Sequence, residues 1–409
     1  MKVLHISKTA VGATWAYHQI RVLRSLGIEV EVVLPSETEG LAPRYREAGV
    51  KVLGVDLDFP ARRPWELRSV LRQCRQIVER VQPDLIHTHH VGTTLVLRLA
   101  LGKDSPVPRV FQVAGPLHLE SELFAKMDMR TAGPHDYWIA TCGWTQGKYQ
   151  TLGLGPERVF LSYAGINVKP FHAVRSGMLR AELGIGPETP LVGMVAYMYA
   201  PKWFLGQRRG LKGHEDFISA LDLVRKKLPQ SKGVIIGGAW DAPWYEKRLR
   251  DYGRRVCNGS LAFLGTRADV PTLYPDLDLA VVPSHSENCG GAVEPLLSGV
   301  PVVATNVGGL PDVIRHGETG WLVPPGNPVE LARAIREALR NKAEAKRRAM
   351  AGLRLGQGLF DVERTAREVA EIYGRIVTRR NAGADLMEAR EVALQSDLLP
   401  TSSAVDRTR

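Results

Sequence analysis

The feature that most constrains this sequence is an alternation of short apolar runs and amphipathic stretches, which occurs twice along the chain. In the first half, runs at 2–6, 29–34 and 109–113 are rich in Val, Leu and Ile and are separated by helix-like segments. The alternation restarts at 191–196, after a Gly- and Pro-rich stretch. Continuous apolar strands separated by helices are typical of a parallel sheet covered on both faces. The sequence therefore predicts an α/β protein with two Rossmann-like, doubly wound domains in tandem.

The chain has 409 residues, which at roughly 150 residues per domain fits two or three domains. We expect the boundaries to follow the changes in periodicity and composition. They predict an N-terminal domain at 1–170, a linker at 171–190, a C-terminal domain at 191–360, a helix at 361–378 that packs back toward the N-terminal domain, and a flexible tail at 379–409.

Composition narrows the cellular context. The four cysteines lie far apart and form no CxxC pair, so neither a zinc site nor a disulfide framework is indicated. The chain shows no secretory signal and no apolar run approaching the ~20 residues of a membrane span, which predicts a cytoplasmic protein. The net charge of +11 is spread evenly, which argues against nucleic-acid binding. An anionic ligand and peripheral contact with the inner face of a membrane fit this charge equally well, and a plain solvated surface is the commonest explanation of such a charge.

The strongest chemical signal lies at 283–312, which reads PSHSENCGGAVEPLLSGVPVVATNVGGLPD. A strand ends just before it, a glycine-rich turn follows at 288–291, and a helix is predicted to begin near Ala292. Backbone amides at the N-terminus of a helix form a ready site for a diphosphate. Glu287 and Glu294 flank the turn, and carboxylates accept hydrogen bonds from the vicinal hydroxyls of ribose or another sugar. Either glutamate alone suits an ordinary surface or helix-dipole role, but the pair around a glycine turn favours ligand binding.

This segment resembles the donor-site signature of the family-4 retaining glycosyltransferases. The resemblance implies the GT-B fold, in which two Rossmann-like, doubly wound domains face a central cleft. The resemblance implies that Glu287 contacts the transferred sugar and that Glu294 binds the ribose hydroxyls. Further resemblances at 138–171, 211–221 and 265–284 cover most of the chain. They imply Lys212 and Arg267 as donor-binding residues. The donor-site signature itself implies that the backbone amides of Asn288, Cys289, Gly290 and Gly291 hold the diphosphate. The family also places the loop that contains Gly12 opposite the donor diphosphate, which implies that Gly12 binds the donor.

The sequence departs from the family pattern in the turn and after the first strand of the second domain. Only six residues separate Glu287 from Glu294, one fewer than in the family, which would move the Glu287 carboxylate. Tyr197 stands where family members place an arginine, so Lys212 remains as the cation for a diphosphate. A long insertion at 197–212 either supplies a second cation or is a surface loop packed by its own aromatic residues. The candidate cations in the insertion are Lys202, Arg208 and Arg209.

Histidines supply two further hypotheses. The family commonly has a histidine near the reacting sugar at the position of Ala114, and His118 follows four residues later. A turn at 115–116 would bring His118 back to that place, so we count it as a candidate catalytic residue. The run HTHH at 87–90 has no accompanying carboxylates, and neighbouring strand residues alternate between faces. We interpret it as structural or substrate-facing, and we expect no metal site.

Together these features and the resemblance indicate a glycosyltransferase, and the resemblance implies that it retains the anomeric configuration. It would move a sugar from a nucleoside-diphosphate sugar to a hydroxyl of a glycan, lipid-linked or small-molecule acceptor. The resemblance favours a UDP-sugar as the donor, because uracil is the commonest base in the family. Such an enzyme would act in the synthesis of bacterial surface glycans, glycolipids or natural-product glycosides. Lys212 and the helix N-terminus would stabilise the departing diphosphate, with Glu287 and His118 as the other catalytic candidates and no cofactor or metal. The alternatives are a sugar-nucleotide epimerase of the same fold and a non-catalytic protein that binds nucleotide sugars.

Overall fold

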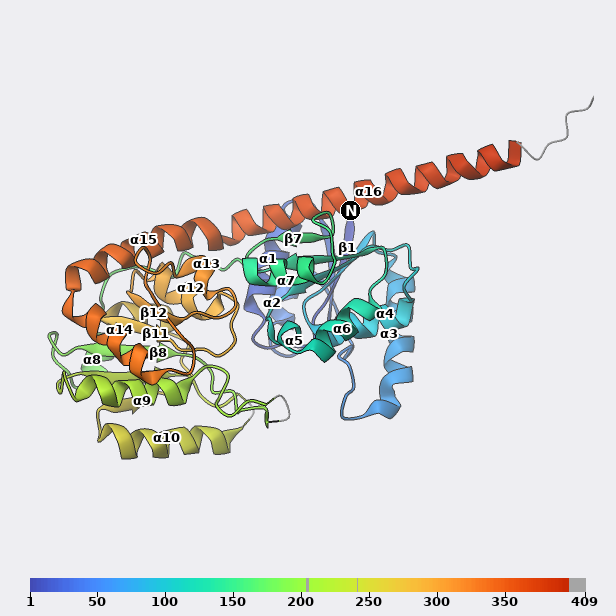
Figure 1. Ribbon diagram of the computed structural model, residues 1–409. Helices are drawn as coiled ribbons and strands as arrows, with labels where there is room; N and C mark the ends of the chain where they lie inside the picture. The colour runs from blue at the N-terminus through green and yellow to red at the C-terminus, as the bar shows by residue number, and fades with distance from the viewer. Residues whose placement is uncertain (204–205, 241, 397–409) are drawn as a thin grey trace, which may run out of the picture.

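The computed structural model describes residues 1–203, 206–240 and 242–396, with side chains described as far as Arg380. It contains two parallel sheets, of seven and six strands, which lie in successive halves of the chain (Figure 1). Both sheets are covered by helices on their two faces, as continuous apolar strands require. The predicted α/β fold with two doubly wound domains is therefore confirmed.

The N-terminal sheet has β1 and β4 at its centre, and every neighbouring pair is parallel. In spatial order its strands are β3 (Lys51–Gly54), β2 (Glu29–Leu34), β1 (Lys2–Ile6), β4 (Leu85–Thr88), β5 (Arg109–Val113), β6 (Asp136–Ala140) and β7 (Val159–Leu161). The helices of this half are α1 (Thr14–Ser25), α2 (Ala42–Glu47), α3 (Leu67–Val81), α4 (Val91–Leu101), α5 (Leu117–Glu120), α6 (Glu122–Thr131) and α7 (Gly143–Thr151).

The C-terminal sheet has β8 and β11 at its centre, and it is also parallel throughout. In spatial order its strands are β10 (Leu261–Phe263), β9 (Lys232–Ile236), β8 (Leu191–Val195), β11 (Leu279–Val282), β12 (Val302–Thr305) and β13 (Trp321–Val323). The helices are α8 (Met178–Glu182), α9 (His214–Arg225), α10 (Pro243–Cys257), α11 (Val270–Leu273), α12 (Gly290–Leu297), α13 (Leu310–Val313), α14 (Pro328–Arg340) and α15 (Lys342–Phe360).

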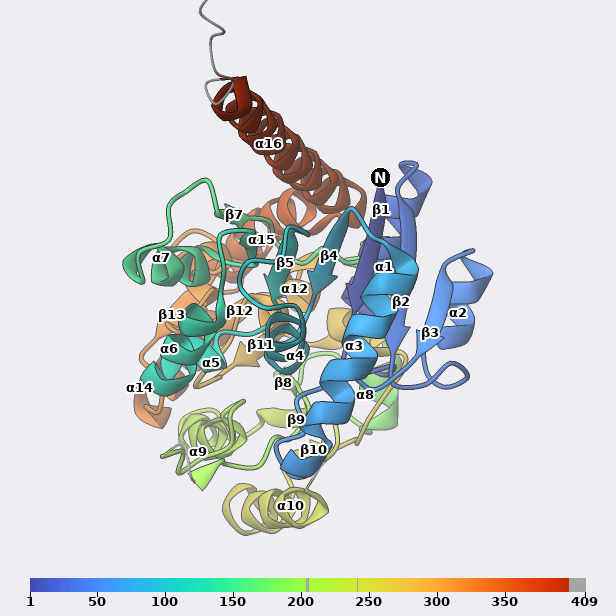
Figure 2. The same cartoon turned by 90° about the vertical axis from the view of Figure 1, so that its right-hand side faces the viewer.

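The last helix, α16 (Val362–Ser396), follows α15 and returns from the C-terminal half to lie against α1 (Figures 1 and 2). Its buried residues Val369, Ile372, Tyr373 and Ile376 belong to the same apolar cluster as Tyr17, Ile20 and Leu23 of α1. The helix ends at Ser396 rather than near residue 378. The added stretch is rich in Ala, Leu, Glu and Arg and contains no proline, so helix propensity sustains it without an apolar period. Residues 397–409 of the predicted flexible tail lie outside the described residues.

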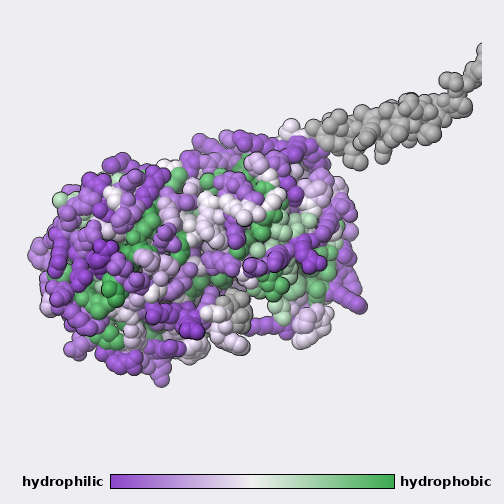
Figure 3. Space-filling model, viewed as in Figure 1, coloured by the Kyte–Doolittle hydropathy of each residue, from purple (hydrophilic) through white to green (hydrophobic). Residues whose placement is uncertain are grey.

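Hydrophilic residues dominate the surface seen in Figure 3, and hydrophobic residues appear there as separate patches over both halves. Within the described part of the chain, none of the helices combines the length and the apolar composition that a bilayer crossing requires.

Candidate functional site

A cavity of about 370 Å³ lies at the carboxyl ends of β8 and β11, the position where open α/β sheets bind their ligands. The C-terminal domain supplies nearly all of its wall, and Gly12 of the N-terminal domain closes one side. Six of the predicted site residues line it. They are Gly12, Lys212, Glu287, Gly290, Gly291 and Glu294.

The glycine turn presents backbone donors to this cavity. Helix α12 begins at Gly290, two residues earlier than predicted, because the Ala292 amide already donates to the Cys289 carbonyl. In the described part of the chain the N–H groups of Gly290 and Gly291 have no hydrogen-bond acceptor. A Cβ at Gly291 would lie 2.9 Å from Cγ1 of Val282 and 3.0 Å from a carboxylate oxygen of Glu287. Only glycine fits at position 291 without displacing these side chains. Because the two amides have no acceptor among the residues that the structure describes, the turn has the form of an anion site.

Lys212 and Glu287 form an ion pair at the cavity wall, with 2.5 Å between Nζ and Oε2. The Ser284 hydroxyl also donates to this oxygen over 3.2 Å. Lys212 is held in place by the next residue, Gly213, which has φ of +74°. A Cβ at Gly213 would collide with the Pro283 carbonyl, so only glycine fits there. The loop before α9 is thereby fixed to the end of β11. The pair places a cation and a carboxylate within reach of one bound ligand.

Glu294 projects from α12 beside Tyr274, and both residues line the cavity. Burial raises the pKa of Glu294, and a hydrogen bond from the Tyr274 side chain partly offsets that shift. The raised pKa reflects the removal of the carboxyl group from water. It can accept hydrogen bonds from hydroxyls that enter the cavity.

Arg267, predicted to bind the donor, and the three candidate second cations all lie outside the cavity wall. The Arg267 guanidinium lies 2.9 Å from a carboxylate oxygen of Glu182 and 2.7 Å from one of Asp269, and Arg267 is absent from the cavity wall. Arg209 pairs with buried Asp216 of α9. Neither Lys202 nor Arg208 lines the wall either. Nearby carboxylates attract both guanidiniums away from the site, which sequence position alone does not reveal.

His118 is buried in the N-terminal domain rather than exposed to the cavity. Its Nε2 lies 3.0 Å from the Tyr149 hydroxyl, which donates to Asp128 over 2.7 Å. Asp128 in turn pairs with buried Arg98. The geometry therefore does not support the predicted catalytic role, because this polar network turns the imidazole inward.

Sequence reasoning missed an aromatic cluster at the mouth of the cavity, made by Tyr197, Tyr199 and Trp240. The Trp240 ring centroid lies 5.1 Å from that of Tyr197 and 5.6 Å from that of Tyr199. Gly12, with φ of +84°, faces this cluster, and a Cβ there would lie 3.4 Å from Cη2 of Trp240. The dense aromatic content of YMYAPKW and GGAW was the available signal.

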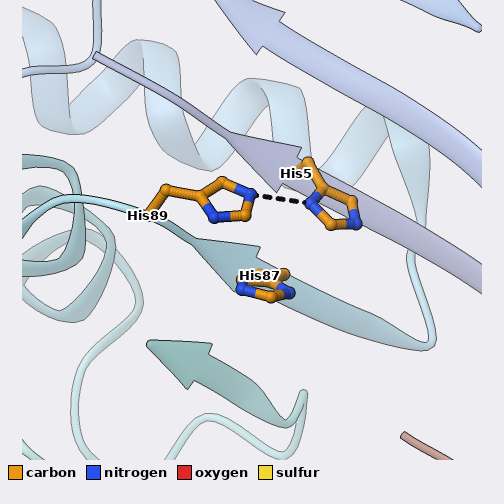
Figure 4. Close-up of side chains that lie close together, drawn as sticks. All are labelled: His5, His87 and His89. Carbon is orange, nitrogen blue, oxygen red and sulfur yellow. Dashed lines mark hydrogen bonds between the residues drawn. The ribbon is translucent and has the colours of Figure 1, made fainter. Parts of the chain in front are cut away.

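A second grouping that the sequence did not reveal is a buried cluster of His5, His87 and His89 (Figure 4). Register between β1 and β4 places His5 beside His87, and His89 follows on the same side. Nδ1 of His5 lies 3.0 Å from Nε2 of His89. The His87 ring stacks on both others, with interplanar angles of 27° and 28°. Metal ligation uses in-plane nitrogen lone pairs, and stacked rings do not direct these at one point, so this arrangement favours a structural role.

Comparison with solved structures identifies the fold. The Anabaena protein HepE, solved in complex with UDP-glucose, superposes with a TM-score of 0.74 at 22% identity, covering 91% of this chain and 98% of that one. Sucrose-phosphate synthase from Thermosynechococcus elongatus gives 0.75 at 19% identity, covering 93% of this chain and all of that one. The fold is thus the GT-B fold.

Sequence comparison identifies the family. Residues 12–169 match the model described as Glycosyltransferase Family 4, and residues 203–341 match Glycosyl transferases group 1. A D-inositol 3-phosphate glycosyltransferase from Thermobispora bispora is 26% identical over 402 residues, which is 88% of each chain. Glycogen synthase from Mycobacterium tuberculosis is 30% identical over 49% of this chain, which spans about half the length of that relative. The chain belongs to the family-4 glycosyltransferases of bacterial type.

Proposed function

We propose that this protein transfers a sugar from a UDP-sugar to an acceptor hydroxyl with retention of the anomeric configuration. The observation that carries the proposal is the cavity itself, whose wall combines the unpaired amides of Gly290 and Gly291 with the Lys212–Glu287 ion pair and, further along, Glu294. This set matches a nucleoside diphosphate bearing a sugar at one end and a ribose at the other. The likeness to HepE, which was solved with UDP-glucose, supports uracil as the base.

The chemical demand is stabilisation of the charge that grows on the departing diphosphate. Fixed donors at the N-terminus of α12 and the Lys212 ammonium supply it without reorganisation. A bound diphosphate competes with Glu287 for Lys212, which frees the Glu287 carboxylate to accept hydrogen bonds from the sugar. Glu294 accepts from the ribose hydroxyls. Attack on the face from which the diphosphate leaves lets a phosphate oxygen take the acceptor proton, so the buried His118 is not required as a base.

The acceptor in this proposal is a hydroxyl on a surface glycan, a glycolipid or a natural-product glycoside. The positive net charge of +11 favours an anionic acceptor or one held at the inner face of a membrane. The reaction needs no metal, because Lys212 and the helix N-terminus neutralise the diphosphate.

The direct test measures UDP release from a panel of UDP-sugars offered with candidate acceptors, with NMR of the product anomer as the readout of retention. Glu294→Gln should weaken UDP binding, and Arg267→Ala, which alters a side chain outside the cavity, serves as its matched control. Isomerised UDP-sugar formed without acceptor would instead identify an epimerase. Binding of UDP-sugars without any turnover would identify a non-catalytic binding protein.

A further inference from the structure

We propose that Asn288 is a positioning residue. Its side chain fastens the glycine turn at 288–291, called the donor turn below, to the N-terminal domain and so keeps the cleft in its reactive arrangement. The inference rests on the proposed function and assigns to Asn288 a role distinct from the backbone contact implied by resemblance. Asn288 directly follows Glu287 and is 7% exposed. Its side chain points out of its own domain.

All polar atoms of this side chain are used across the domain boundary. Nδ2 donates to the Val113 carbonyl over 3.2 Å and to the Thr141 hydroxyl over 2.6 Å. Oδ1 accepts from the Cys142 thiol over 3.2 Å, with the Thr145 hydroxyl at 3.5 Å. These partners lie at the ends of β5 and β6 and at the start of α7. A buried amide with every donor and acceptor engaged holds one geometry, because any separation leaves its polar atoms unpaired.

The main chain behind Glu287 is fixed as well. Gly309 donates its N–H to the Glu287 carbonyl over 3.1 Å. Gly308 has φ of +49°, and a Cβ there would lie 1.8 Å from the same carbonyl oxygen, whereas a Cβ at Gly309 would lie 2.4 Å from Cβ of Cys142. The two glycines thus allow the loop after β12 to support the turn and the N-terminal domain to approach it.

A second tie reinforces the same contact. Asp312 of α13 accepts hydrogen bonds from the Gly143 amide over 2.7 Å and from the Tyr163 hydroxyl over 3.1 Å. Opening the cleft must break both ties, and breaking the Asn288 contacts moves the residue next to Glu287. Domain closure and the position of the Glu287 carboxylate are therefore coupled through one side chain. The amides of Gly290 and Gly291 belong to the C-terminal domain alone. Binding of UDP therefore does not require the hydrogen bonds of the Asn288 side chain across the domain boundary, which we call the latch.

The test compares the full-length protein with Asn288→Ala and Asn288→Asp, and with Asn306→Ala as the control. Asn306 is exposed and belongs to the same signature segment. UDP affinity is measured by calorimetry, turnover by UDP release from UDP-glucose, and domain separation by small-angle scattering. We expect both Asn288 variants to bind UDP within about threefold of the unaltered protein, to lose at least about tenfold in turnover, and to show a larger radius of gyration. The control should change none of these.

A conservative pair on the partner side separates positioning from simple destabilisation. Thr141→Ser keeps the hydroxyl that accepts from Asn288, and Thr141→Val removes it at similar volume. The serine variant should keep turnover, and the valine variant should lose it with UDP affinity retained. Equal behaviour of Asn288→Ala and Asn306→Ala in turnover and in scattering would overturn the proposal. If UDP does not bind the unaltered protein, the proposed function fails, yet hydrogen exchange at 113 and 141–145 in Asn288→Ala still tests the latch.

Discussion

At the scale of single residues, the Lys212–Glu287 ion pair occupies the wall where the donor diphosphate is proposed to bind. A cation already paired with a carboxylate is stabilised in place, and its stem is fixed by the turn at Gly213. The ligand therefore meets a charge whose position is set in advance. This is the arrangement in which electrostatic stabilisation is most effective.

Replacing Lys212 by alanine should lower the turnover of a UDP-sugar by about 100-fold or more, the usual effect of removing one preorganised stabiliser of a developing anion. The same change leaves Glu287 without its partner, so UDP affinity should also fall. Steady-state UDP release and calorimetry measure the two effects. Turnover equal to that of Arg267→Ala would show that Lys212 does not stabilise the diphosphate.

Burial of the histidine cluster makes stability depend on pH. Burial lowers the pKa of His5 to about 3, and those of His87 and His89 also lie well below the ordinary value. Between about pH 6.5 and about pH 3 the unfolded chain binds protons that the folded chain does not, so stability falls as the pH falls. Each such group adds about 1.4 kcal/mol per pH unit within that range.

The free energy of unfolding should therefore fall less steeply with decreasing pH in His5→Gln than in the unaltered protein. Below about pH 6.5 the slope should be smaller by roughly the contribution of one histidine. Denaturant unfolding at several pH values measures the slope directly. His172→Gln provides a control outside the cluster. A slope identical to that of the unaltered protein would mean that His5 is protonated in the folded state.

At the scale of elements, helix α16 is the strap that joins the C-terminal half to the N-terminal domain. Its fully buried Tyr373 packs in the cluster with α1, and its hydroxyl meets Nδ1 of His87 and lies 3.4 Å from Nε2 of His5. One residue thus links the strap, the first helix and the histidine cluster. Its packing explains why the helix follows the N-terminal domain after leaving α15.

Tyr373→Ala should destabilise the protein by about 3–5 kcal/mol, the range for truncating a large buried aromatic side chain. Tyr373→Phe keeps the ring and should cost only about 1–3 kcal/mol, because it leaves a buried histidine nitrogen without its partner. Glu371→Ala, at an exposed position of the same helix, is the control. Urea unfolding followed by circular dichroism distinguishes the three. Equal loss in the alanine and control variants would refute the strap.

At the scale of the whole molecule, the site is built where the two halves meet. The C-terminal domain supplies charge and backbone donors, and the N-terminal domain closes the cavity with Gly12 and holds the donor turn through Asn288. Of the two carboxylates in the wall, Glu287 is paired with Lys212 and Glu294 lies beside Tyr274. Among the described residues, the group of three potential metal ligands is the histidine cluster, which does not line this cavity.

We therefore expect UDP release from UDP-glucose to be unchanged after treatment with EDTA and unaffected by added Mg²⁺ or Mn²⁺. The assay is the same steady-state measurement. Lys212→Ala is included to test whether a divalent cation replaces the lost ammonium in that variant alone. Loss of turnover in the unaltered protein upon chelation, restored by one divalent ion, would contradict a metal-independent reaction.

The sequence by itself determined the features that depend on neighbours along the chain. Apolar periodicity located the parallel strands of both sheets, and the spacing of Glu287, the glycine turn and Glu294 located the cavity wall, because a strand, a turn and a helix start are set by local residues. Only the tertiary structure decided which distant groups meet. Arg267 and Arg209 pair with carboxylates, His118 enters a buried network, His5 joins His87 across two strands, and Asn288 reaches the opposite domain. Such contacts depend on sheet order and domain docking, which no short stretch of chain encodes.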